Sequence, residues 1–287
     1  KATAARTETD IAPAPTDTPR ALLLDYQRRY ADDAARFKIW LKARQIGGDF
    51  TQAEEIVRDC LWTEANGRRS DWVIAAPSER QSLLSFSKCV QWAAAYGESI
   101  DAIEEDREDS ESILCAAKMV FPGGSTITAL PGKPETVRGF TCNVALTEFG
   151  YFENPDETWR ALFFTTANEF SGEKKIRLLS TPNGIGNKLH QIWSENYQRP
   201  GAAWSCHRTT IHDAVKDGLP CDLEALREVL LDPEGWNQEM LLEFLDSSLV
   251  LLPYDLIASC ESDLSTRVIP FDYWSTSDGP PRYAGID

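Results

Sequence analysis

The sequence lacks the features of a disulfide-stabilised, zinc-binding or membrane-spanning protein. No two cysteines form a C-x-x-C pair and their number is odd, which favours reduced thiols in a cytoplasmic compartment. No apolar run is long enough to cross a bilayer, because the stretch 249–252 is short and ends at Pro253. No secretory signal is visible, and the chain begins at Lys1 rather than Met, so we expect a trimmed chain. The seven cysteines stand at positions 60, 89, 115, 142, 206, 221 and 260.

Positive charge is also scarce. The 287 residues include 29 Lys and Arg against 45 Asp and Glu, so the formal net charge is −16. Generic nucleic-acid binders are usually basic, so any DNA contact must come from local cationic clusters or from a partner. Each cluster is by default a solvated surface. The clusters are Arg28-Arg29, Arg68-Arg69 and the segment 174–177.

The three histidines offer no recognisable metal-binding or nucleophilic arrangement. His190, His207 and His212 have no spacing typical of a metal site, and the chain order supports no Ser/His/Asp or Cys/His set. The chain is nevertheless 42% hydrophobic, which is enough to bury a full core. We expect one large domain, or a core with a small attachment.

The stretch 36–62 predicts a strand, a tight turn with two glycines and two cations, and then a helix. Backbone N–H groups at the start of such a helix point outward, and together with the helix dipole they bind phosphate. We therefore predict a nucleotide triphosphate loop over 42–49, with an ordinary strand–helix turn as the alternative. The helix is indicated by apolar residues at helical spacing, namely Phe50, Ala53, Ile56, Val57, Cys60 and Leu61.

This loop departs from the usual Walker A pattern, G-x-x-x-x-G-K-[ST]. In that pattern the Lys reaches the terminal phosphates and the Ser or Thr hydroxyl contacts Mg²⁺. Here Lys42 stands at the position of the first Gly, Gly48 at that of the Lys, and Asp49 at that of the hydroxyl.

The rest of the chain alternates strands with helices. A hairpin is expected over 119–130, and a solvated loop or helix face over the acidic run 98–111. This alternation predicts an α/β fold with a mostly parallel sheet covered on both faces. We expect strands over 71–77, 143–148, 176–180 and 203–210, and helices over 21–30, 78–96, 155–168, 187–197, 223–231 and 236–244.

Polar residues follow three of the expected strands, at the sheet edge where ligands of such folds collect. They are Lys42–Asp49, Thr147-Glu148 and Ser180-Thr181. We expect the three segments to meet around a bound nucleotide. Their convergence is the strongest signal that the residues themselves give.

Several motifs occur in the order found in the large terminase subunit of tailed phages. From about Leu24 to its end the chain resembles that family, most closely the Mu-like branch. The resemblance implies a P-loop NTPase fold of the ASCE or RecA-like kind, and an ATPase motor that pumps double-stranded DNA into a procapsid. The motifs are Tyr26-Gln27, 42–47 (KARQIG), 146–150 (LTEFG), 179–184 (LSTPNG), 236–245 (WNQEMLLEFL) and 283–287 (YAGID).

The resemblance implies which residues bind ATP. Gln27 resembles the glutamine that reads adenine, and its alternative is a surface position on an amphipathic helix. Lys42 and Arg44 are expected to supply the positive charge that Gly48 cannot; the alternative for Lys42 is a strand end with its ammonium group in water. The expected loop residues are Lys42, Ala43, Arg44, Gln45, Ile46, Gly47, Gly48 and Asp49.

The resemblance also implies catalytic and coupling residues. Glu148 resembles the base that orients or deprotonates the attacking water, and the alternative is an ion pair with a nearby cation. Arg44 and Arg138 are candidates for stabilising the γ-phosphate, Arg138 in cis or across a ring, with a structural ion pair as its alternative. Ser180 and Thr181 match the strand end that couples phosphate state to movement, and Thr181 could instead cap the following turn.

Thr147 stands where the Walker B aspartate normally binds Mg²⁺. Because Asp49 stands where the loop hydroxyl is expected, we hypothesise that Asp49 and Thr147 have exchanged metal duties, which leaves the oxygen ligands and their charge unchanged. The competing interpretation is that both positions are degraded and ATP binds weakly or not at all.

The expected organisation has four parts: a flexible tail (1–20), an ATPase core (21–215), a helical lid or linker (216–280) and the first strand of a truncated RNase H-like nuclease (281–287). In the full-length protein Asp287 is a candidate nuclease metal ligand. This chain cannot cut DNA by that route, because two-metal cleavage needs further carboxylates.

The resemblance implies ATP and Mg²⁺ as cofactors. It also implies double-stranded DNA, the portal protein and the small terminase subunit as partners, with a ring of copies on the portal and no membrane contact. The expected location is the cytoplasm of the bacterial host and not the mature virion. The alternatives are a helicase-like DNA translocase, and a docking domain that has kept the fold but lost turnover.

Overall fold

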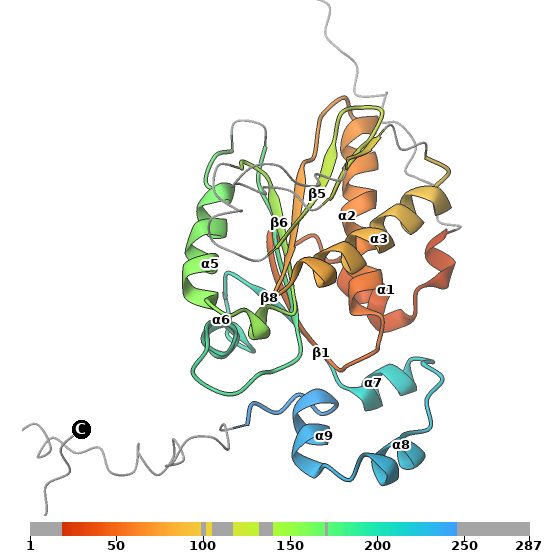
Figure 1. The fold of residues 1–287 in the computed structure, drawn as a ribbon, viewed down its shortest axis with the longest axis vertical. Helices are drawn as coiled ribbons and strands as arrows, with labels where there is room; N and C mark the ends of the chain where they lie inside the picture. Colours follow the sequence, from red (N-terminus) through yellow and green to blue (C-terminus); the bar gives the residue numbers. More distant parts are fainter. Residues whose placement is uncertain (1–18, 99–101, 105–116, 132–139, 170–171, 246–287) are drawn as a thin grey trace, which may run out of the picture. The chain divides into compact units, whose positions relative to one another are not determined.

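The computed structural model describes residues 19–98, 102–104, 117–131, 140–169 and 172–245, and Figure 1 shows their arrangement. By its internal contacts the chain divides into two units, Lys1–Leu245 and Asp246–Asp287, and the second lies outside the described residues. Arg138, Asp287 and nearly all of the expected tail lie outside them as well.

Eight strands of the described part form one sheet, in the order β3-β4-β5-β2-β6-β7-β1-β8. Neighbouring strands are parallel except in the β3–β4 and β4–β5 pairs, so the prediction of a mostly parallel sheet is confirmed. The strands are β1 (Phe37–Lys42), β2 (Trp72–Ala76), β3 (Ala102–Glu104), β4 (Ala117–Val120), β5 (Thr126–Pro131), β6 (Asn143–Thr147), β7 (Ile176–Ser180) and β8 (Ser205–Thr209).

Helices cover both faces of this sheet (Figure 1). Alternate residues of a strand point to opposite faces. On β2, Ile74 packs in the apolar cluster that contains α2 and α3, and Val73 packs in the cluster that contains α5 and α6. The helices on these faces are α1 (Asp25–Asp32), α2 (Gly48–Ala65), α3 (Glu79–Ala95), α5 (Pro155–Phe163) and α6 (Lys188–Asn196).

Three short helices follow β8 and lie beyond one end of the sheet (Figure 1). They are held to it by a third apolar cluster, in which Trp236 packs with Tyr26 and Trp40. These helices are α7 (Ile211–Lys216), α8 (Leu223–Leu230) and α9 (Pro233–Glu239), and the 3-10 helices of the described part are η1 (Pro19–Leu22), η2 (Phe149–Tyr151) and η3 (Phe164–Thr166).

Three element predictions need correction. Ala102–Glu104 forms β3, although the acidic run 98–111 was expected to be a loop or helix face. Helix α7 was not predicted, although Thr210 and Asp213 form a capping box that fixes its start. Helix α9 begins at Pro233 and ends at Glu239 instead of spanning 236–244, because the Asp232 carboxylate caps its first turn.

The boundary between an ATPase core ending at 215 and a lid or linker over 216–280 stays a prediction. Within the described ranges, no helix is both long enough and apolar enough to cross a membrane.

Candidate nucleotide-binding site

A cavity of about 510 Å³ lies at the carboxyl ends of β1, β2, β6 and β7. Its size is typical of a small-molecule site. The three polar segments that the sequence predicted to converge all contribute to its lining. The predicted residues that line it are Lys42, Arg44, Gln45, Gly47, Gly48, Asp49, Thr147, Glu148 and Thr181.

The loop between β1 and α2 forms one wall of this cavity. Gly47 caps α2 with a φ of 75°, a left-handed conformation that glycine adopts without steric cost. The first turn of α2 starts at Gly48, so the backbone N–H groups that lack helical partners lie at the cavity. This is the arrangement that binds phosphate at helix N-termini.

The position of Lys42 explains why glycine stands where Walker A normally has lysine. A Cβ on Gly48 would lie 3.1 Å from the Lys42 Cδ atom and 3.2 Å from Cε. The stem of Lys42 thus passes directly over the Gly48 backbone and brings an ammonium group to the region that the usual lysine serves. A side chain at position 48 would push it away.

Lys42 is paired with the predicted catalytic base. Its Nζ atom lies 2.6 Å from Glu148 Oε1, and Lys42 is buried while Glu148 is partly exposed. Glu148 also has a φ of 54°, which is strained for a residue other than glycine. Such strain is concentrated at functional sites, and here it turns the carboxylate into the cavity at the end of β6.

Asp49 and Thr147, the candidate metal ligands, lie at the same cavity. Both also line a small adjoining space of about 10 Å³. The Asp49 Oδ2 atom lies 3.3 Å from Lys88 Nζ, whereas Oδ1 is buried and has no hydrogen-bond partner among the described residues. The predicted exchange of metal duties stays a hypothesis that this arrangement permits.

Arg44 contacts α9 across the cavity. Its backbone N–H donates to the Glu239 carbonyl oxygen at 3.0 Å, and its guanidinium lies 3.7 Å from the Glu239 carboxylate. The Tyr151 hydroxyl donates to the same carboxylate at 2.8 Å. Burial raises the pKa of Tyr151 to about 12, so its hydroxyl remains protonated near neutral pH.

The end of β7 is tied to the segment after β6. The Ser180 hydroxyl accepts from Gly150 N–H at 3.1 Å and donates to the Thr181 carbonyl oxygen at 2.7 Å. The Thr181 hydroxyl lies 3.1 Å from the Tyr151 hydroxyl. Hydrogen bonds therefore run from the end of β7 through Tyr151 to Glu239 on α9.

Four predicted residues do not line the cavity but support its wall. The Gln27 side chain is buried behind the loop, where Nε2 donates to the Ile46 carbonyl oxygen at 3.2 Å. Ala43 and Ile46 pack in the third apolar cluster, and Ser180 is fully buried. Adenine reading by Gln27 stays a prediction, since an amide that makes these bonds keeps spare donor and acceptor capacity.

Sequence reasoning missed several lining residues. Gln81, Leu84 and Lys88 come from one face of α3, at the helical spacings of three and four residues. The missed signal was the position of α3 directly after β2, whose carboxyl end lies at the same edge as the predicted sites. The remaining missed residues are Pro77, Tyr151 and Glu239.

Comparison with known proteins indicates the family. The Mu-like prophage FluMu protein gp28 of Haemophilus influenzae is 28% identical over 230 residues, which are 78% of this chain and 44% of that protein. The probable terminase large subunit gp28 of Escherichia phage Mu is 29% identical over 217 residues, or 74% of this chain and 38% of that protein. The resemblance to phage large terminase subunits is confirmed. No protein-family model matches the chain.

Solved terminase structures have the same fold. The large terminase ATPase domain of Thermus phage P74-26 superposes with a TM-score of 0.60 at 18% identity, over 81% of this chain and 100% of that one. The large terminase of another thermophilic bacteriophage, in complex with ATP-gamma-S, gives a TM-score of 0.58 at 10% identity, over 77% and 53%. The predicted P-loop α/β fold is confirmed. The chain spans less than half the length of the two curated relatives.

Proposed function

We propose that this chain is the ATPase motor domain of a DNA-packaging terminase large subunit. The observation that carries the proposal is the meeting of the α2 N-terminus, Lys42, Glu148 and Thr181 at one cavity of suitable size. The likeness to terminase large subunits supports the same conclusion, and so does the thermophilic phage terminase that was solved with ATP-gamma-S.

Each residue has a defined task in hydrolysis. Lys42, Arg44 and the backbone N–H groups at the start of α2 bind the phosphates. Glu148 orients a water molecule for in-line attack on the γ-phosphate and accepts its proton. Since Lys42 lies 2.6 Å from Glu148, phosphate that draws the ammonium group away also leaves the carboxylate available to the water.

The residues at the cavity fit Mg²⁺. The metal prefers oxygen ligands such as carboxylates and hydroxyls, and it stabilises charge on the transferring phosphoryl group when bound. Asp49 offers a buried carboxylate oxygen without a partner in the described part of the chain, and Thr147 offers a hydroxyl at the same cavity. We assign these two residues to the metal.

The motor couples this site to movement through α9. The hydrogen bonds from Thr181 through Tyr151 to Glu239 connect the phosphate side of the sheet to a helix outside it. The proposed partners are double-stranded DNA, the portal protein, the small terminase subunit and further copies of the chain in a ring. The proposed location is the cytoplasm of the bacterial host.

Calorimetry and a turnover assay test the proposal. We expect a non-hydrolysable ATP analogue to bind with Mg²⁺, and DNA to stimulate ATP turnover. Binding without turnover, with or without DNA, supports a docking domain that has lost activity. Failure to bind any nucleotide contradicts the proposed function.

A further inference from the structure

The cavity contains a cation that no motif assigns. Lys88 lies on α3, in the interior of a helix whose apolar face packs in the core, and its side chain lines the cavity with Gln81 and Leu84. The Lys88 Nζ atom lies 3.3 Å from Asp49 Oδ2. The side chains are 31% and 23% exposed, so neither is locked in the core.

The described lining balances its charges pair by pair. Three cations, Lys42, Arg44 and Lys88, face three carboxylates, Glu148, Glu239 and Asp49, at 2.6, 3.7 and 3.3 Å respectively. A triphosphate is strongly anionic and competes with each carboxylate for its cation. Lys88 is therefore in the same position relative to a nucleotide as the two loop cations.

Asp49 gives Lys88 a specific reason to be there. The usual loop has a neutral hydroxyl at this position, so Asp49 adds a negative charge beside the phosphates. A flexible ammonium group with three donors can neutralise that charge and can also move to a phosphate oxygen. Partly exposed ion pairs contribute little to stability, so the exchange of partners costs little.

We propose that Lys88 is a phosphate-binding residue that exchanges Asp49 for an oxygen of the terminal phosphate. The exchange leaves both Asp49 oxygens available to Mg²⁺. The inference rests on the proposed function, since it requires a nucleotide in this cavity. It adds a third phosphate-binding cation, from a helix outside the nucleotide loop.

The competing role for Lys88 is structural, as the permanent partner of Asp49. The two roles make opposite predictions for a Lys88→Met variant. A permanent partner competes with Mg²⁺ for Asp49, so its loss strengthens Mg²⁺ binding and leaves the preference for ATP over ADP unchanged. A phosphate-binding residue gives the reverse, because its loss removes contacts that only the terminal phosphate makes.

The chain offers a matched control in Lys175. This lysine is 32% exposed and pairs with Asp59, another carboxylate of α2, at 2.5 Å, but it does not line the cavity. Lys175→Met therefore removes the same kind of ion pair from the same helix, without any contact to a nucleotide.

The experiment compares wild type, Lys88→Met, Lys88→Arg and Lys175→Met in the 287-residue chain. Calorimetry gives the affinities for a non-hydrolysable ATP analogue and for ADP at saturating Mg²⁺, and a Mg²⁺ titration gives the half-saturation point. Thermal unfolding shows that each variant is folded, and Lys88→Gln replaces Lys88→Met if the latter is not.

We expect Lys88→Met to weaken the ATP analogue by about 10-fold or more, the effect of losing a charged hydrogen bond, and ADP by much less. Lys88→Arg should retain most of the affinity, and Lys175→Met all of it. An unchanged ATP-to-ADP ratio in Lys88→Met, with wild type binding both nucleotides, overturns this inference alone. Wild type that binds neither nucleotide overturns the proposed function, and this inference with it.

Discussion

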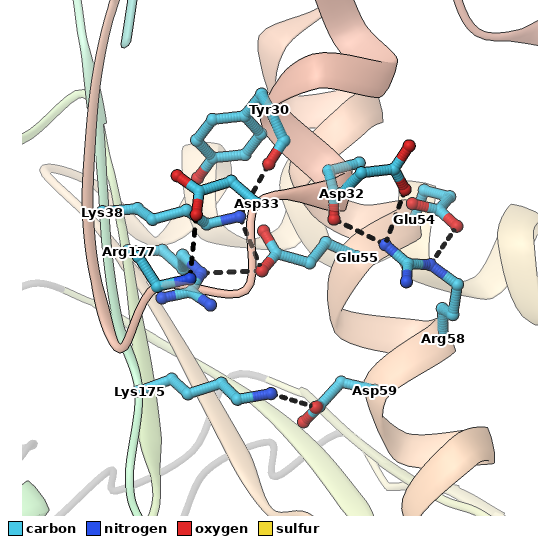
Figure 2. A network of polar contacts seen from close by, with 12 residues as sticks. Tyr30, Asp32, Asp33, Lys38, Glu54, Glu55, Arg58, Asp59, Lys175 and Arg177 are labelled. Atoms are coloured by element: carbon cyan, nitrogen blue, oxygen red, sulfur yellow. Dashed lines mark hydrogen bonds and ion pairs between the residues drawn. The ribbon is translucent and has the colours of Figure 1, made fainter. Parts of the chain in front are cut away.

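Two sets of ion pairs share β1 and α2 but differ in their surroundings. Lys38 and Lys42 are four residues apart on β1, and each pairs with a carboxylate. The first set, which we call the buried network, is centred on Lys38, Glu55 and Arg177 (Figure 2). The second, the cavity pairs, comprises Lys42–Glu148, Arg44–Glu239 and Lys88–Asp49.

In the buried network each charge has several partners. The Lys38 Nζ atom lies 2.9 Å from Glu55 Oε1 and donates to the Tyr30 carbonyl oxygen at 2.7 Å. Arg177 donates to Glu55 at 2.8 Å and to the Arg36 carbonyl oxygen at 2.8 Å. Burial lowers the pKa of Lys38 to about 8, and the Glu55 carboxylate opposes that shift.

The cavity pairs are joined one to one and face an open space. Taking a charge from the buried network leaves another charge uncompensated in the core, whereas a cavity charge can find water or a ligand instead. The number of partners and the access to solvent, rather than the residue types, thus separate ion pairs that hold the fold from pairs that can be exchanged.

The largest effect is expected from Glu148→Gln, which breaks a cavity pair. ATP turnover should fall by about 10²- to 10⁴-fold, the usual contribution of a general base, because an amide cannot accept the proton. Affinity for an ATP analogue should be retained, since Lys42 loses only a competitor for phosphate. Steady-state turnover and calorimetry check the two parts. Equal losses in both would show that Glu148 acts in binding.

Glu55→Gln tests the other side of the comparison. It leaves Lys38 and Arg177 buried with reduced compensation, so the free energy of unfolding should fall by about 3–5 kcal/mol. Glu148→Gln serves as the matched change, with an expected loss of at most about 1 kcal/mol. Denaturant unfolding measures both values. Similar losses for the two variants would remove the distinction between the two sets.

The exchange of metal duties predicts a rescue. Asp49→Thr and Thr147→Asp should each weaken Mg²⁺-dependent binding of an ATP analogue by about 10- to 100-fold, the scale seen when the groups around a metal are altered. The double variant should recover most of that loss, because it restores the usual hydroxyl and carboxylate positions. Mg²⁺ titrations followed by calorimetry check this. Equal loss in all three variants would contradict the exchange.

The sequence predicted the parts of the site that follow directly from a strand. Lys42, Glu148 and Thr181 end or follow buried apolar runs, and parallel strands place their carboxyl ends at one edge, so local pattern was sufficient. The order of the eight strands was not predictable in the same way, because it depends on pairing between distant segments.

The missed site residues depend on tertiary contacts. The apolar stripe of α3 was predicted, but which of its polar residues faces the cavity depends on how the helix packs on the sheet, so Lys88 was not found. Glu239 enters the site through a contact with Arg44, which lies far earlier in the chain. Gln27 shows the opposite error, since it was expected to face the nucleotide and instead supports the loop from behind.

The smallest effect is expected from Asp33, at the edge of the buried network. Burial alone would raise the pKa of Asp33, but hydrogen bonds from Ser205, His207 and the Ala35 N–H group outweigh it and lower the pKa from 3.8 to about 2. A carboxyl whose pKa is depressed by folding adds stability above its unfolded pKa and loses it as the pH falls toward its folded pKa.

Wild type should therefore lose stability between about pH 4 and pH 2, and Asp33→Asn should lose about 1 kcal/mol less, a value reduced for solvent screening. Denaturant unfolding at several pH values measures the difference. Parallel curves for the two proteins would show that the Asp33–His207 contact, at 2.7 Å, adds no net stability. That result would place this contact with the exchangeable pairs, although it borders the buried network, and solvent access would then be the deciding factor.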